Sequence, residues 1–261
     1  MGQAVFNTLL HQLGPGHVIG FFLVLARISP LFVLAPLFSS TMIPVQVRAI
    51  IAMALSLGLT PLAMHGQPVP SDPLMIAGLF VCNALVGLAF ALAVGAVFAG
   101  ISSAGAVLDV ISGFSYGALI NPFDGNQGGV LTNLYTIVGL ALFIAIGGDA
   151  WMLRGIAHTL TLVPLTSAPP INSLVAGVDS AVGSIFVSAL EVAAPAMLAL
   201  LITDVAFGMV SRVVPQLNVF AVGFPLKIGV VLLVVAAALP LLGGFMSDQV
   251  ASAVTNILQA M

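Results

Sequence analysis

The chain consists of long apolar stretches separated by short polar ones. Six such stretches cover residues 18–38, 43–64, 74–108, 130–146, 181–210 and 217–245. Each is longer than the roughly 10 residues of a membrane-spanning strand, and apolar and polar residues do not alternate within it. Backbone groups in hydrocarbon must be hydrogen-bonded within the chain, which leaves helices as the structure. The pattern predicts one all-α domain, a helical membrane protein with about six long apolar helices.

Composition leads to the same class of protein. The chain has 261 residues, of which 5 are Lys or Arg and 8 are Asp or Glu, and its mean hydropathy is +1.25. A soluble globular domain carries about 25% charged residues, so this class is excluded. Residues 1–26 contain no Lys or Arg and therefore lack the basic beginning of a cleaved signal peptide. The single cysteine, Cys82, excludes an internal disulfide and a cysteine metal site.

The third stretch has a face made of small residues. Its length, about 50 Å as one helix, exceeds the roughly 30 Å of the hydrocarbon core. Small residues recur at every fourth position, at Gly87, Ala91, Gly95, Ala99 and Ser103. Helices in membranes associate closely along such a ridge. We expect the ridge to serve either packing within the chain or a contact between subunits.

Prolines interrupt most of the other stretches, at Pro30, Pro36, Pro195, Pro225 and Pro240. Each removes a helix hydrogen bond and favours a kink. Broken helices at membrane depth are tolerated where protein or a water-filled path lines them. Kinked helices therefore favour a transporter or a channel-forming assembly over a plain membrane anchor.

Charged residues inside apolar stretches form a second set of candidates. Arg27, Glu191, Asp204 and Lys227 lie within stretches, and Asp109 directly follows the third. We expect Arg27, Asp109, Glu191 and Asp204 to be buried, because a charge at membrane depth is costly unless it is paired or functional. Mutual neutralisation between helices is the favoured interpretation. The alternative is a proton or ion relay, which usually stacks several acids along one path.

Residues 109–129 form a segment rich in Gly, Asn and Pro but also in aromatic and apolar residues. Pro122 and the Asp124-Gly125 pair are typical of turns. A loop of about 20 residues in a compact protein is usually functional. We expect it to act as a plug or constriction, with its bulk supplied by Phe114, Tyr116, Leu119, Ile120 and Phe123.

The same segment contains a G-x-S-x-G pattern, Gly113-Phe-Ser-Tyr-Gly117, followed by Asp149 and His158 in the order of a hydrolase triad. This motif works on a strand that feeds a helix, and no alternation of strands and helices is predicted. No metal-ligand spacing, phosphate-binding loop or redox motif is visible. We therefore predict no enzymatic activity, no metal, no cofactor and no nucleic-acid partner.

Three motifs spread along the chain carry a family resemblance. The first is Arg27-Ile-Ser-Pro-Leu-Phe-Val-Leu-Ala-Pro-Leu-Phe-Ser-Ser40 with Ile43-Pro-Val-Gln-Val-Arg48, and the second is Gly113-Phe-Ser-Tyr through Asn121-Pro122. The third and most specific is Pro215-Gln-Leu-Asn-Val-Phe-Ala-Val-Gly-Phe-Pro-Leu-Lys227. In this order, over nearly the whole chain, they resemble the FliR family of type III secretion export-gate proteins.

The resemblance implies a subunit of a hollow, hetero-oligomeric helical assembly built from helical hairpins, through which unfolded export substrates pass. Its expected partners are several copies each of FliP-like and FliQ-like subunits, FlhB-like and FlhA-like proteins, and membrane lipid. It further implies that residues 1–175 are FliP-like, with the plug loop at 105–129, and that residues 176–261 form a FliQ-like hairpin. The expected location is the flagellar basal body in the bacterial inner membrane, displaced toward the periplasm within the assembly.

The resemblance also assigns individual residues. It implies that a second set shapes the closed mouth of the gate or contacts partners: Gln216, Asn218, Phe220, Phe224 and Lys227. The form Gly223-Phe-Pro-Leu-Lys227 favours flagellar over virulence-type secretion. The chain departs from the family at Ala106, where Glu is common, and near Asp204, where Asn is common.

A different class of function stays open from the residues alone. It is a self-sufficient secondary transporter or channel for small solutes or ions, which commonly has inverted repeats and a charged site at mid-membrane. Neither a convincing repeat nor a convergent cluster of charges is visible in the sequence. A structural scaffold without a conduit is a weaker third possibility, because the plug-like segment argues against it.

Overall fold

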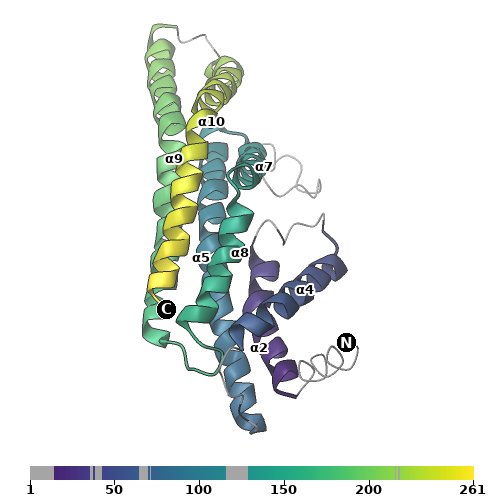
Figure 1. The fold of residues 1–261 in the computed structure, drawn as a ribbon. Coiled ribbons are helices and arrows are strands. Elements are labelled where there is room, and N and C mark those ends of the chain that lie inside the picture. The colour runs from purple at the N-terminus through teal and green to yellow at the C-terminus, as the bar shows by residue number, and fades with distance from the viewer. Residues whose placement is uncertain are drawn as a thin grey trace. The chain divides into compact units, whose positions relative to one another are not determined.

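The computed structural model describes residues 15–35, 38, 43–64, 70, 72–115, 129–214, 216 and 218–261. Within these residues all regular secondary structure is helical (Figure 1). The helices are α2 (Pro15–Leu34), α4 (Val45–Ala63), α5 (Pro73–Ser112), α7 (Val130–Ala145), α8 (Gly148–Leu162), α9 (Ile171–Val213) and α10 (Val219–Gln259). The predicted all-α class is therefore confirmed.

Five helices are long and apolar enough to cross a membrane, or up to six if the bent pair α7 and α8 counts as one span. A short break separates α7 from α8. It falls at Gly147, whose backbone has a φ of +71°, a conformation that favours glycine. Length and composition thus agree with the six apolar stretches of the sequence, although the fourth, residues 130–146, covers only α7 of the broken pair.

Three helices have boundaries that differ from the sequence-based expectation. Helix α5 has 40 residues and continues to Ser112, so the start of the expected plug loop at residues 105–112 is helical. In this part of α5, Gly105 and Asp109 lie against α7, as described below. Helices α9 and α10, with 43 and 41 residues, also extend beyond their apolar stretches.

Helix α8 was missed from hydropathy because polar residues such as Asp149, Arg154 and His158 interrupt it. These three residues are exposed, whereas Met152, Ile156 and Leu160 are buried at intervals of four. That periodicity is the signature of an amphipathic helix. A test for a period of 3.6 residues would therefore have found α8.

The described prolines that interrupt the apolar stretches lie inside helices rather than at their ends. Pro30 is in α2, Pro195 in α9, and Pro225 and Pro240 are in α10. A further proline, Pro61, lies near the end of α4. Pro36 falls outside the described residues.

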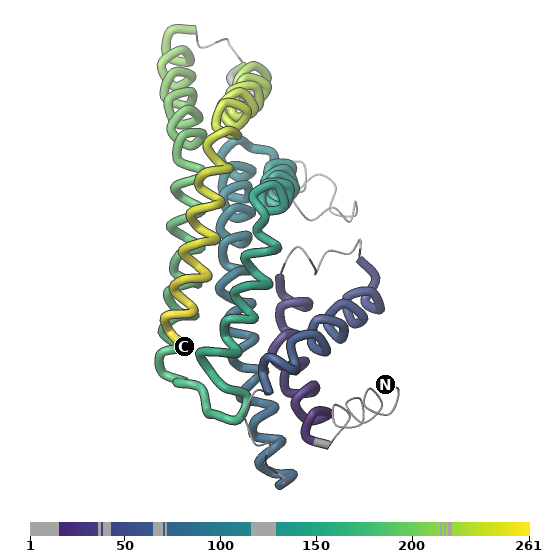
Figure 2. Tube along the Cα trace, viewed as in Figure 1, coloured from purple at the N-terminus to yellow at the C-terminus, as the bar shows by residue number. Residues whose placement is uncertain are grey.

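Contacts divide the chain into two compact units. The first comprises Met1–Gly95, Asp149–Ala181 and Ala251–Met261, and the second comprises Ala96–Gly148 and Val182–Val250. Helices α5, α9 and α10 each contribute residues to both units. In the first unit α2 and α4 lie side by side (Figure 2), and the α2 core residues Leu23, Val24 and Leu31 are buried.

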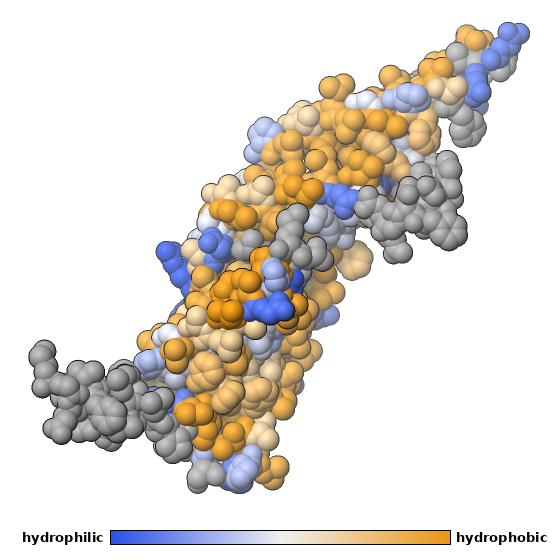
Figure 3. Space-filling view, turned by 90° about the vertical axis from the view of Figure 1, so that its right-hand side faces the viewer, coloured by the Kyte–Doolittle hydropathy of each residue, from blue (hydrophilic) through white to orange (hydrophobic). Residues whose placement is uncertain are grey.

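The described surface is mostly apolar. Figure 3 shows apolar side chains, in orange, over most of the face that it presents. Large hydrophobic side chains are exposed along α4, α9 and α10, including Leu57, Ile202 and Leu233. A soluble monomer rarely exposes such extensive apolar area. The surface is that of a chain surrounded by lipid or by other apolar helices.

Candidate functional site

Arg27 of α2 is buried, with 1% of its surface exposed. Its Nη1 donates to the carbonyl oxygens of Thr159 at 2.9 Å and Val163 at 2.7 Å. Its Nη2 donates to Oδ1 of Asn83 at 2.6 Å. Thr159 is in the last turn of α8 and Val163 directly follows this helix, at the end whose partial negative charge attracts a cation. Arg27 therefore fixes α2 to the end of α8.

Asn83 of α5 completes this buried cluster. Its Nδ2 donates to the carbonyl oxygens of Leu79 at 2.8 Å and Leu165 at 3.0 Å, which joins α5 to the turn after α8. The guanidinium Nε of Arg27 has no hydrogen-bond partner among the described residues. The sequence predicted that charges in the apolar stretches neutralise one another, for example Arg27 or Lys227 with an acid. Lys227 does pair with an acid, Asp204, whereas Arg27 binds carbonyl and amide oxygens because the end of α8 supplies the acceptors.

Asp109 near the end of α5 is also buried, with 2% of its surface exposed. Its Oδ1 accepts from the backbone N–H of Leu131 at 2.8 Å. Its Oδ2 accepts from the backbone N–H of Thr132 at 2.8 Å and from Thr132 Oγ1 at 2.7 Å. These donors lie in the first turn of α7, whose preceding residue, Gly129, offers no side chain to cap it. Asp109 thus caps a neighbouring helix.

Two glycines make room for this cap. A Cβ atom on Gly129 would collide with the Asp109 carboxylate. A Cβ atom on Gly105 would lie 2.7 Å from the Leu131 carbonyl oxygen and 2.8 Å from the Thr132 nitrogen. The backbones of α5 and α7 can therefore approach closely only with glycine at these positions.

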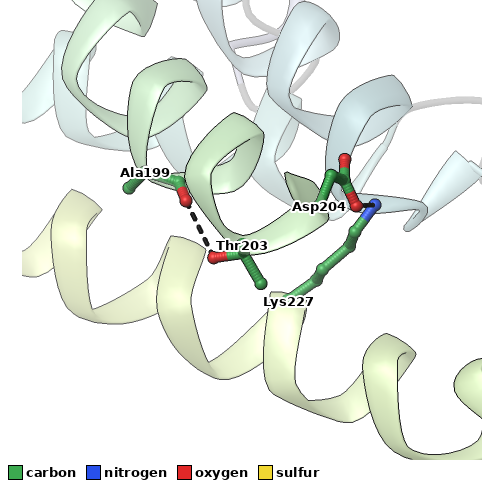
Figure 4. Close-up of polar contacts among 4 residues, drawn as sticks. All are labelled: Ala199, Thr203, Asp204 and Lys227. Carbon is green, nitrogen blue, oxygen red and sulfur yellow. Dashed lines mark hydrogen bonds and ion pairs between the residues drawn. The ribbon is translucent and has the colours of Figure 1, made fainter. Parts of the chain in front are cut away.

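Asp204 of α9 and Lys227 of α10 form an ion pair and point toward one another in Figure 4. Neighbouring Thr203 donates from Oγ1 to the Ala199 carbonyl oxygen at 2.8 Å. The Lys227 side chain is 22% exposed and that of Asp204 49% exposed. Asp204 and Glu191, expected to be buried, are both exposed, and contact with Lys227 of α10 still leaves 49% of the Asp204 side chain exposed.

The small-residue ridge packs within the chain at its first two positions. A Cβ atom on Gly87 would collide with the backbone carbonyl oxygen of Arg27, and Ala91 is buried. At Gly95 a Cβ atom would meet only the Leu34 carbonyl oxygen, at 3.9 Å. Ala99 and Ser103 are half-exposed. The later part of the ridge therefore has room for a further contact.

The expected plug and gate residues are only partly described. Phe114 is half-buried in a turn after α5, whereas Tyr116, Leu119, Ile120 and Phe123 lie outside the described residues. Gln216 and Asn218 are exposed, and Phe224 is half-buried. Asn218 Oδ1 accepts from the backbone N–H of Ala221 at 3.2 Å, at the beginning of α10. The side chain of Phe220 lies outside the described residues.

An apolar pocket of about 600 Å³ lies between α2 and α4. Its lining includes Phe22, Phe32, Met53 and Phe80, and Arg48 is its charged member. Arg48 Nε donates to the Ile43 carbonyl oxygen at 3.0 Å. Among the described residues no group of three or more His, Cys, Asp or Glu could hold a metal ion.

The hydrolase-like pattern has no suitable framework in the described part of the chain. Ser115 is half-buried beyond the end of α5, and Asp149 and His158 are on α8. His158 Nδ1 interacts with Thr161 Oγ1 at 2.8 Å. A nucleophile elbow requires a strand that feeds a helix, and the described residues contain only helices.

Known proteins resemble this chain over most of its length. The model of the family described as bacterial export proteins, family 1, matches residues 18–253. The flagellar biosynthetic protein FliR of Escherichia coli is 27% identical over 238 residues, covering 91% of this chain and 90% of that protein. FliR of Bacillus subtilis is 31% identical over 215 residues, covering 80% and 82%. The surface presentation of antigens protein SpaR of Salmonella typhimurium is 25% identical over 230 residues, covering 86% and 83%.

Proposed function

Because this chain belongs to family 1 of the bacterial export proteins, we propose that it is the FliR-like export-gate subunit of a flagellar type III secretion apparatus. The observation that carries the proposal is the family match over residues 18–253. Relatives named FliR and SpaR cover most of the chain in the same way. This favours the export gate over a self-sufficient transporter of small solutes.

The mechanism that we propose is passive conduction. The chain contributes helices to the wall of a protein-conducting channel, and unfolded export substrates pass through it. The exposed apolar faces of α4, α9 and α10 support this role, because they need other helices or lipid to cover them. A conduit of this kind needs no catalytic group, and the chain acts as a structural component of the gate.

The partners that we propose are FliP-like and FliQ-like subunits in several copies, with FlhB-like and FlhA-like proteins in contact with the gate. In this arrangement residues 1–175 act as the FliP-like part and residues 176–261 as the FliQ-like hairpin. Its support is the family resemblance and the pairing of α9 with α10 through Asp204 and Lys227.

Two segments have proposed gating roles. The aromatic and glycine-rich segment after α5, to which Phe114 belongs, acts as a plug that seals the channel at rest. Residues 216–227 shape the closed mouth of the channel or contact a partner there. The support is the composition of the first segment and the family resemblance of the second.

The proposed location is the inner membrane at the flagellar basal body. The apolar helices support an integral membrane position. Displacement of the assembled gate toward the periplasm is part of the proposal, since α5, α9 and α10 at about 60 Å are longer than the roughly 30 Å of a hydrocarbon core.

The test is native mass spectrometry of the tagged chain after gentle detergent extraction from its own cells. One copy of this chain with several copies of two smaller apolar proteins is the expected result. A bare monomer or homodimer would overturn the proposal. Transport of small solutes by liposomes that contain this chain alone would then support the transporter.

A further inference from the structure

Helix α9 has an exposed apolar face with one charged residue in it. Its members recur at intervals of three, four or seven residues and are Val187, Glu191, Leu198, Ile202, Val205 and Met209. The five apolar members are each more than half exposed, and Glu191 is exposed as well. Since these intervals follow the helical period, the six side chains project from one side of α9. We call this surface the Glu191 face.

The described residues offer Glu191 no cation. All five basic residues of the chain lie in the described part, and one of them, Lys227, forms an ion pair with Asp204. Within the compact unit that holds this part of α9, the other cation is Arg212, which lies 21 residues along the same helix, or about 30 Å away.

Apart from Lys227, the neighbouring helices in this unit supply no cation either. Helix α7 contains no charged residue, and α10 contains none between Lys227 and Asp248. Asp204, thirteen residues further along α9, does have a cation partner within the chain, because Lys227 of α10 neutralises it. Glu191 and Asp204 of α9 therefore differ: Asp204 has its counter-charge within the chain and Glu191 does not.

An ionised carboxylate directed into lipid is expensive, and acids in membrane helices almost always face protein or water. Helix α9 is long and apolar enough to cross a membrane. The apolar members on both sides of Glu191 along the helix argue against a water-filled surface. An apolar helix that carries a cation would cover the apolar side chains of the face and also neutralise the Glu191 carboxylate.

We propose that the Glu191 face binds an apolar helix of another subunit that carries a lysine or arginine opposite Glu191. The apolar members pack against that helix, and the cation neutralises the carboxylate. The inference rests on the proposed function, because it requires a hetero-oligomeric gate, but it adds the residue and the chemistry of the contact.

The test replaces Glu191 in the full chain and measures which subunits remain bound after gentle extraction, by native mass spectrometry. Glu191→Leu makes the face fully apolar, so it favours insertion into lipid while leaving the partner's cation unpaired. We expect one subunit species to be lost from the complex, with at least about tenfold less bound than in the wild type. Glu191→Lys, which adds repulsion, should lose more.

Asp179 provides the matched control, since it is an exposed acid on the same helix. It lies twelve residues before Glu191, which places it about 120° away around the helix. Asp179→Leu and Asp179→Lys should leave the subunit composition unchanged. Circular dichroism of each purified variant shows whether its helices are intact.

The outcomes separate this inference from the proposed function. If the wild-type chain is extracted without partners, the proposed function fails. If the wild type retains partners and Glu191→Leu retains them equally, the Glu191 face is covered by lipid and only the inference fails. Loss of a subunit with Glu191→Leu but not with Asp179→Leu supports the inference. A charge reversal then identifies the paired residue. In the Glu191→Lys background, each lysine or arginine of the lost subunit is replaced in turn by Glu, and the replacement that restores binding marks the partner of Glu191.

Discussion

At the scale of single residues, the two most buried charges both satisfy the ends of helices. Asp109 accepts hydrogen bonds at the amino end of α7, and Arg27 donates to carbonyls at the carboxyl end of α8. Each side-chain charge is opposite in sign to the partial charge of the helix end that it contacts. A buried ion can thus be compensated by backbone groups without an opposite charge from another side chain.

Asp109→Ala should destabilise the protein by about 2–4 kcal/mol. The substitution removes three hydrogen bonds and leaves the N–H groups of Leu131 and Thr132 without their acceptor. The measurement is the free energy of unfolding in detergent. Ser102→Ala is the control, because that half-buried hydroxyl on the same helix bonds only within its own turn, to the Ala99 carbonyl. Equal stability of the two variants would contradict the capping role.

Arg27→Lys should also destabilise the protein, by about 1–3 kcal/mol, although it keeps the charge. A lysine ammonium cannot reproduce the fork that reaches Thr159, Val163 and Asn83 together. Thermal unfolding in detergent measures the effect. Arg154→Lys on the exposed side of α8 should change the unfolding temperature little, and a similar small change for Arg27→Lys would argue against the fork.

At the scale of elements, the close approach of α2 and α5 depends on Gly87. The atom that a Cβ would meet belongs to the backbone of Arg27, which cannot turn aside as a side chain can. The small-residue ridge therefore has a structural role at its beginning. Gly95, in the middle of the ridge, makes no equally close contact within the chain.

Gly87→Ala should destabilise the protein by about 1–3 kcal/mol, because the added methyl group forces α2 and α5 apart. The free energy of unfolding in detergent measures this. Gly78→Ala on the same helix is the control, since a Cβ there meets nothing within 4 Å. It should be neutral or stabilise the helix by up to about 1 kcal/mol. The opposite order of stability would show that α2 and α5 do not pack as described.

At the scale of the whole molecule, the Asp109 cap has a consequence for the proposed plug. It joins the end of α5 to the start of α7 through residues outside 113–123. Deleting residues 113–123 should therefore leave the complex assembled while the resting membrane becomes permeable to small ions. Conductance of membranes that contain the complex is the measurement. An unchanged conductance in an intact complex would remove the plug from the proposed mechanism.

The sequence by itself determined the class of structure and the family. Uninterrupted apolar stretches leave helices as the way to satisfy the backbone in hydrocarbon, and the ordered motifs identify the relatives. It also placed the small-residue ridge and most helices. Its helix boundaries were less accurate at Ser112, and α8 was missed, because hydropathy averages over an amphipathic period.

Tertiary structure alone decided how the charges are compensated. Nothing in the sequence shows that Arg27 binds the end of α8, that Asp109 caps α7, or that Asp204 pairs with Lys227 while Glu191 is left exposed. Hydropathy reports how costly it is to bury a charge, but the compensating partner lies far away along the chain. Only the packing of the helices brings carbonyls, N–H groups and opposite charges within hydrogen-bond distance.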